Sequence, residues 1–195
     1  MLEVADFDYA WDMRTPTGTP ISLEEYISTV YDPDREYVDG EAIERNMGEF
    51  DHAGLQTAIA ALLYGQRREA GIYVFVELRV QTSPTRFRVP DVTVTTRKGK
   101  GRILREPPFL CIEILSPEDR VSRMEARIAD YLRFGVEFIW LIDPQERRAW
   151  TYTREGRRET DDVLATSNPN LTLRLDDVFR SLDEDVERDE GAGKQ

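Results

Sequence analysis

Two acidic residues lie within segments that otherwise have the composition of buried β-strands. The run 109–115 is apolar and of strand length, and Glu113 is its one charged residue. The segment 88–95 is rich in valine and threonine and contains the pair Pro90-Asp91. A carboxylate in an apolar strand costs free energy unless a cation compensates its charge. Two such acids on neighbouring strands predict a site for a hard divalent metal ion, and they suggest the cleavage of phosphodiester bonds.

The order of the two strands indicates how these acids could meet. If the strands pair antiparallel, the beginning of the first lies beside the end of the second. Asp91 and Glu113 then occupy the same end of the sheet. Successive side chains point to opposite faces of a strand, so Asp91 is expected to share a face with Thr93, and Glu113 with Cys111 and Leu115. This geometry permits the two carboxylates to share one metal ion.

The remaining segments predict helices and strands around this pair. Apolar periodicity and end signals predict helices at 22–31, 51–70 and 117–134, a hairpin at 36–44 that turns at Asp39-Gly40, and strands at 73–82, 138–142, 148–153 and 171–175. The strand 73–82 is expected to be continuous, with Glu77 and Arg79 on its polar face. This order predicts an α/β sandwich in which helices flank a mixed central β-sheet.

Length and composition are those of one soluble globular domain. The chain has 195 residues, of which 40% are hydrophobic and 33% charged. We expect an acidic N-terminal extension at 1–18, a domain at 19–180 and an acidic, disordered tail at 181–195. Its single cysteine excludes an internal disulfide. No apolar stretch approaches the ~20 residues that span a bilayer, and the acidic N-terminus is unlike a signal peptide. A cytoplasmic protein without membrane contact is expected.

The net charge of −12 is unfavourable for a protein that meets DNA, because phosphate contacts need lysine and arginine. Half of this charge lies in the segment 176–190, which carries −6 by itself. The segment 97–105 is the opposite, since it has five basic residues and no acid. It is either a solvated, glycine-rich loop or a loop that contacts phosphates through Lys98, Lys100 and Arg102.

The motifs together resemble the PD-(D/E)xK, restriction-endonuclease-like superfamily and, within it, the bacterial Uma-two family. The resemblance covers about residues 19–155. It rests on six blocks in the right order, namely Glu36-Tyr-Val-Asp-Gly-Glu41, His52 before a helix, Val89-Pro-Asp91, Glu113-Ile-Leu-Ser116-Pro, Tyr131 with Gly135-Val136, and Trp140-Leu-Ile-Asp143-Pro. The resemblance implies a DNA endonuclease that depends on Mg²⁺, with Mn²⁺ as a substitute, and that often forms a homodimer. Its metal ligands would be Asp91, Glu113 and the main-chain carbonyl of Ile114.

The chain departs from the superfamily at one catalytic position. The usual lysine, two residues after the second acid, is Leu115 here. In the Uma-two family this lysine typically lies on the following helix, at the position that Arg127 occupies. Lys98 cannot replace it, because seven residues along a strand span roughly 23 Å at about 3.3 Å per residue. Arginine can hold a phosphate and stabilise its transition-state charge, but it cannot lose a proton and act as the general base.

Several residues have more than one interpretation. Arg127 is either the phosphate clamp or the ion-pair partner of Asp91, Glu113 or Asp130. Glu36 supplies an outer metal ligand or a structural contact, and His52 positions substrate or makes a structural hydrogen bond. Glu77 is a third carboxylate of the site or, more simply, an ion-pair partner near Arg79. Two functions therefore remain, a metal-dependent endonuclease and a non-catalytic protein of the same fold that binds nucleic acid or a protein partner.

Overall fold

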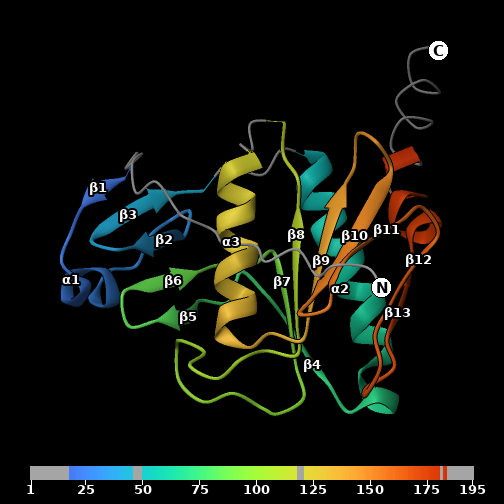
Figure 1. Ribbon diagram of the computed structural model, residues 1–195, viewed down its shortest axis with the longest axis horizontal. Helices are drawn as coiled ribbons and strands as arrows, with labels where there is room; N and C mark the ends of the chain where they lie inside the picture. Colours follow the sequence, from blue (N-terminus) through green and yellow to red (C-terminus); the bar gives the residue numbers. More distant parts are fainter. Residues whose placement is uncertain (1–17, 46–49, 118–120, 181, 184–195) are drawn as a thin grey trace, which may run out of the picture.

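The computed structural model describes residues 18–45, 50–117, 121–180 and 182–183. The predicted N-terminal extension, apart from Gly18, and nearly all of the predicted tail lie outside these residues. Among the described residues, no helix has the length and apolar character needed to cross a membrane. Figure 1 shows two sheets beside each other, with the long helix α3 (Val121–Phe134) in front and between them.

The larger sheet has six strands and is mixed, as predicted. Its order is β11 (Gly156–Thr160), β10 (Arg148–Thr153), β9 (Phe138–Asp143), β8 (Leu110–Ile114), β7 (Val92–Thr95) and β4 (Tyr73–Val76). Only β8 and β9 are parallel among these neighbours, because α3 connects them and returns the chain to the same end of the sheet.

The smaller sheet has five strands and its own helix. Its order is β1 (Thr19–Pro20), β3 (Glu41–Glu44), β2 (Arg35–Val38), β6 (Arg86–Arg88) and β5 (Val80–Ser83). The predicted hairpin joins β2 to β3, and its turn has the positive φ angles that Asp39 (48°) and Gly40 (105°) tolerate. The helix α1 (Leu23–Ser28) begins where predicted, since the Ser22 hydroxyl accepts a hydrogen bond from the Glu25 N–H at 3.1 Å.

Two helices cover opposite faces of the six-stranded sheet. Buried Leu55, Ile59 and Leu63 of α2 (Phe50–Ala70) pack against the side chains of β7 and β8 that face one way. Met124 and Ile128 of α3 pack against the other face. The alternation along β8 therefore sends its even-numbered residues to the α2 side and its odd-numbered residues, including the predicted Glu113, to the α3 side.

The predicted continuous strand 73–82 is wrong. Glu77 has a φ of 50°, which no extended strand accommodates, and the chain breaks there into β4 and β5. The two strands lie in different sheets, so the alternating residues of 73–82 belong to two separate surfaces and not to one. Val76, which alternation would place on the opposite face from Glu77 and Arg79, is 53% exposed.

The predicted strand 88–95 is likewise interrupted. Its first residue ends β6 in the small sheet, and β7 begins at Val92 in the large sheet. The proline at 90 has no N–H to donate to a ladder, and the chain passes from one sheet to the other at 89–91. Asp91 is thus the last residue of this crossing, directly before β7.

Some elements at the C-terminal side were not predicted. The strand β11 extends the large sheet, and β12 (Val163–Ala165) pairs with β13 (Thr172–Arg174), the strand predicted at 171–175. Residues 175–180 are helical. The helix predicted at 117–134 corresponds to α3, and residues 118–120, near its predicted start, lie outside the described part of the chain.

Candidate active site

The two acids singled out in the sequence lie side by side. The antiparallel register of β7 and β8 pairs Val92 with Ile112, which brings Asp91 level with Glu113. The Ile114 N–H donates a hydrogen bond to Asp91 Oδ2 at 2.8 Å. Asp91 is 3% exposed and Glu113 is 1% exposed, so both carboxylates are nearly removed from water. Their charges must be compensated by the protein or by a bound ion.

Asp91 is compensated by an arginine that the sequence did not indicate. The Arg45 guanidinium contacts Asp91 Oδ1 at 2.6 Å, and its other amine contacts Glu77 Oε1 at 3.0 Å. His52, near the start of α2, places Nε2 3.4 Å from Asp91 Oδ2. The Gln56 amide donates to the Asp91 carbonyl at 3.0 Å. The first two turns of α2 therefore help to hold the crossing segment in place.

Glu113 faces α3, which supplies two partners. The Tyr131 hydroxyl donates to Glu113 Oε1 at 2.5 Å, and Arg127 contacts Glu113 Oε2 at 3.3 Å. Burial raises the pKa of Glu113 from 4.5 to about 7, and the charges of Asp91 and Glu36 add to this rise, although Arg127 and Tyr131 oppose it. Burial also raises the pKa of Tyr131, so its hydroxyl keeps the proton that it donates.

Arg127 lies between Glu113 and a second buried acid. Its Nε contacts Glu36 Oε1 at 3.2 Å, and Glu36 also binds Arg88 at 2.7 Å. Burial acts to raise the pKa of Glu36, but Arg127 and Arg88 outweigh it and lower the pKa to about 2. Glu36 is thus a carboxylate at any ordinary pH, whereas Glu113 gains and loses a proton near neutrality.

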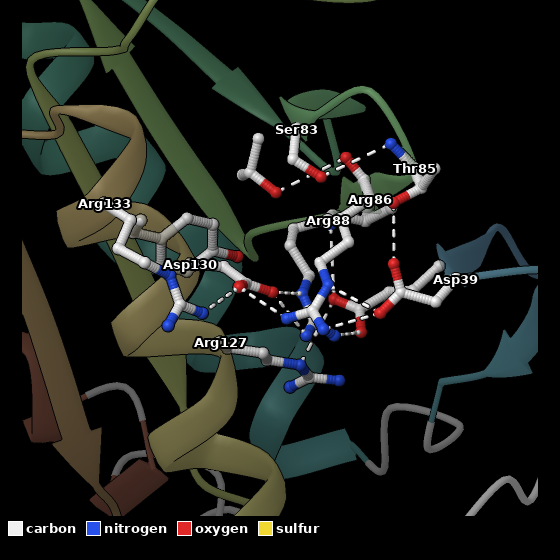
Figure 2. Close-up of polar contacts among 12 residues, drawn as sticks. Asp39, Ser83, Thr85, Arg86, Arg88, Arg127, Asp130 and Arg133 are labelled. Carbon is white, nitrogen blue, oxygen red and sulfur yellow. Dashed lines mark hydrogen bonds and ion pairs between the residues drawn. The ribbon is translucent and has the colours of Figure 1, made fainter. Parts of the chain in front are cut away.

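A network of ion pairs joins Arg88, the partner of Glu36, to Asp130 of α3, and Figure 2 shows Arg88 and Asp130. Arg88, which is 5% exposed, donates from Nε and Nη2 to Asp130 Oδ2 at 2.9 and 2.7 Å. Asp130 also receives Arg86 and Arg133. The predicted alternative partner of Arg127, Asp130, is therefore held by other arginines. The network fixes the position of β6 and β2 against the helix that carries Arg127.

The other predicted residues lie at varying distances from this pair. Glu77 contacts Arg45, while Arg79, its expected neighbour, pairs with Asp34 instead. Lys98 and Lys100 are exposed on the connection from β7 to β8, at the ends of these strands opposite to Asp91 and Glu113. Arg102 of the same connection lines an open pocket of about 860 Å³ together with Glu77.

Comparisons with known proteins give a matching family and a similar solved structure. The model of the Uma2 family, described as "putative restriction endonuclease", matches residues 23–187. The chain belongs to the Uma2 family. A crystal structure from Anabaena variabilis ATCC 29413, titled as a putative nuclease belonging to DUF820, is similar with a TM-score of 0.74 and 27% identity. The match covers 84% of this chain and 99% of that one, and the fold is restriction-endonuclease-like. No curated protein matches the sequence.

The donor set of this Uma2 protein fits a magnesium ion. The described part of the chain has no group of three His, Cys, Asp or Glu residues suited to a metal ion. Mg²⁺ does not need such a cage, because it keeps several waters and typically binds one or two carboxylates together with substrate phosphates. Two adjacent buried carboxylates, one of them with a pKa raised by burial and further by the other's charge, are such a donor pair.

Two residues whose side chains contact the paired carboxylates escaped the reasoning from sequence, to different degrees. Tyr131 belongs to a Uma2 block but had no assigned contact, and its place on α3, four residues after Arg127, was the available signal. Arg45 had no signal, because it follows β3 without any motif around it. It reaches Asp91 only because folding brings the end of β3 within side-chain reach of the crossing segment.

Proposed function

We propose that this protein is an endodeoxyribonuclease that hydrolyses DNA phosphodiester bonds with Mg²⁺, for which Mn²⁺ can substitute. The observation that carries the proposal is the buried pair Asp91 and Glu113 at one end of adjacent strands, each in contact with an arginine. A fold that keeps two acids together in its interior sustains a large electrostatic cost. A bound divalent ion would offset the repulsion between the two carboxylates, so metal binding gives a functional reason for the pair.

Asp91, Glu113 and the main-chain carbonyl of Ile114 would hold the ion. When bound, Mg²⁺ supplies Lewis-acid stabilisation of the phosphate and a lower pKa for a coordinated water. Tyr131 orients the Glu113 carboxylate through its 2.5 Å hydrogen bond. Ionisation of Glu113 is complete only above its pKa of about 7, so metal binding should strengthen as the pH rises through neutrality.

Arg127 would contact the phosphate under attack. Its guanidinium can form two parallel hydrogen bonds to phosphate oxygens and stabilise the charge that develops there. Glu36 contacts the Arg127 Nε at 3.2 Å, and this contact fixes the side chain up to its guanidinium. The terminal amines then remain for contacts with the phosphate. Arginine keeps its proton throughout, so it stabilises charge and does not act as a base.

The remaining predicted residues have supporting roles in this proposal. His52 positions Asp91 from α2, and Glu77 keeps Arg45 at the edge of the site. Lys98 and Lys100 would contact DNA phosphates away from the point of cleavage, where a bound duplex could extend. Arg102 would contact phosphates from the pocket that it shares with Glu77. In a homodimer, which we also propose, two copies of the site would allow both strands to be cut.

A plasmid-nicking assay with Mg²⁺ or Mn²⁺ tests the proposal. The wild-type protein should convert supercoiled plasmid to nicked and linear forms, and Asp91→Asn and Glu113→Gln should each lower the rate by at least a hundredfold. Glu146→Gln is the matched control, because this exposed acid pairs with Arg148 on the surface. Nicking that is unchanged in both site variants would assign the activity to a contaminant or to other residues.

A non-catalytic protein of the same fold is the second candidate. It is favoured by the contacts of Arg127, which pairs with two nearly fully buried acids as a purely structural arginine would. This candidate expects DNA binding or protein binding without nicking under any divalent ion. Calorimetric titration with Mn²⁺ distinguishes the nuclease from the non-catalytic protein. The non-catalytic protein should show no Mn²⁺ binding that depends on Asp91.

A further inference from the structure

Arg45 contacts the Asp91 oxygen that does not take part in the strand pairing. It follows β3, and its side chain is 10% exposed. One terminal amine contacts Asp91 Oδ1 at 2.6 Å and the other contacts Glu77 Oε1 at 3.0 Å. Asp91 is 4% exposed at its side chain and Glu77 is 51% exposed, so a single guanidinium bridges a buried acid and a solvent-facing one.

The two oxygens of Asp91 are used differently. Oδ2 receives the Ile114 N–H at 2.8 Å, a contact fixed by the strand pairing, and His52 lies 3.4 Å from it. Oδ1 is in contact with Arg45. The carboxylate is thus anchored through one oxygen and presents the other to a cation. A cation should bind strongly at Oδ1, because a buried carboxylate without a compensating charge costs free energy.

The electrostatic surroundings of Arg45 are those of a cation site. Although burial acts to lower the pKa of Arg45, Asp91, Glu113, Glu77 and Glu36 together raise it above its ordinary value. These four acids include Asp91 and Glu113, the two carboxylates that we propose as metal ligands. The guanidinium and a divalent ion would therefore be stabilised by the same carboxylates, and Asp91 Oδ1 cannot sit at full contact with both.

We propose that the Arg45 guanidinium neutralises the Asp91 carboxylate in the metal-free protein and is displaced from it when a divalent ion binds. This inference rests on the proposed function and goes beyond it, because it assigns the metal-free state and the exchange of cations. Glu77 keeps the displaced side chain at the edge of the site. There its amines can hold a phosphate oxygen, which guanidinium binds well.

The exchange has a consequence for metal affinity. Binding of the ion must break a charge-assisted contact between Arg45 and Asp91, so the wild-type protein binds the ion more weakly than the carboxylates alone would allow. A hydrogen bond of this kind is worth roughly a tenfold change or more in an equilibrium constant. Removing Arg45 should then strengthen metal binding, which is the opposite of what loss of a structural support would do.

The test uses calorimetric titration with Mn²⁺ alone, and thermal unfolding with and without Mn²⁺, at pH 8. Arg45→Ala should melt lower than wild type without the ion, bind Mn²⁺ roughly tenfold more tightly and regain stability when it binds. Arg45→Lys is the second variant, for use if alanine prevents folding. Lysine keeps the charge but not the fork that spans two acids, so a several-fold tighter Kd is expected.

Arg35→Ala is the matched control. Arg35 lies on the same hairpin and pairs with exposed Glu44 at 2.7 Å, so its loss should leave the Kd for Mn²⁺ unchanged. Unchanged or weaker Mn²⁺ binding by both Arg45 variants, beside a wild-type protein that binds through Asp91, would overturn the exchange and leave the proposed function intact. No Mn²⁺ binding by any of these proteins would overturn both.

Discussion

Arg127→Ala is expected to destabilise the protein by an amount that depends on pH. The replaced guanidinium contacts Glu36 at 3.2 Å and Glu113 at 3.3 Å, and the side chains of these acids are 2% and 1% exposed. Breaking a buried ion pair by removing one partner typically costs about 3–5 kcal/mol. The lower end applies here, because Glu36 keeps Arg88 and Glu113 keeps the Tyr131 hydroxyl.

The pH dependence follows from the raised pKa of Glu113. A folded pKa of about 7 against 4.5 means that the folded state binds this proton more tightly than the unfolded state does. At pH 5.5 Arg127 therefore faces a neutral Glu113 and an ionised Glu36, and we expect a loss of about 1–2 kcal/mol. At pH 8 both acids are ionised, and we expect about 3 kcal/mol.

The growth of the loss has an upper limit. Arg127 lowers the pKa of Glu113, so the pKa in the alanine variant lies above that of the wild type. Above pH 7 the variant keeps a proton that the wild type releases, and the difference in stability grows by at most about 1.4 kcal/mol per pH unit. In the alanine variant, Glu113 thus limits the loss of stability by keeping its proton.

Urea unfolding at pH 5.5 and pH 8 measures both values. Arg148→Ala is the control, since Arg148 also pairs with two acids, Glu146 at 2.9 Å and Glu159 at 3.1 Å, but on an exposed surface. Its loss should cost less than about 1 kcal/mol at either pH. The reasoning is refuted if Arg127→Ala loses the same amount at both pH values, or no more than the control.

Three further predictions concern the same acids and the basic loop. Tyr131→Phe removes the hydrogen bond to Glu113 Oε1, so urea unfolding should show a loss of about 1–3 kcal/mol at pH 8 and a smaller one at pH 5.5. The wild-type protein should itself lose up to about 3 kcal/mol between pH 5 and pH 8 as Glu113 ionises, and Glu113→Gln should remove that dependence; a flat wild-type profile would contradict the raised pKa. Replacing Lys98, Lys100 and Arg102 by glutamine should flatten the salt dependence of DNA binding by about one unit of slope per lost phosphate contact, whereas an unchanged slope would leave the loop in solvent.

Much of the local structure follows from the sequence alone. Ser22 caps α1 because its hydroxyl reaches an N–H three residues away, and Asp39-Gly40 turns the hairpin because these residues tolerate positive φ. The meeting of Asp91 and Glu113 was predictable for a related reason. Two consecutive strands that pair antiparallel place the start of one at the end of the other, and the two-residue period then sends Glu113 towards α3.

The course of the chain between the two sheets was not predictable in the same way. A continuous strand and a strand that breaks at one positive φ have the same alternating pattern in sequence. Glutamate rarely adopts a positive φ, so Glu77 gave no reason to predict a break. Which sheet each half joins depends on which edge is open to it. That is decided by packing across the whole domain and not by the four residues of β4 or β5.

The pairing of cations with acids was decided only by the tertiary structure. Arg45 meets Asp91 across 46 positions, and Arg88 meets Asp130 across 42. An arginine-rich chain offers many partners for each carboxylate, and nothing local distinguishes them. Burial makes the choice, because a carboxylate that loses its water must take the guanidinium that the sheet register brings within reach. The sequence alone therefore determined which two acids form the candidate site, and the fold determined which arginines compensate them.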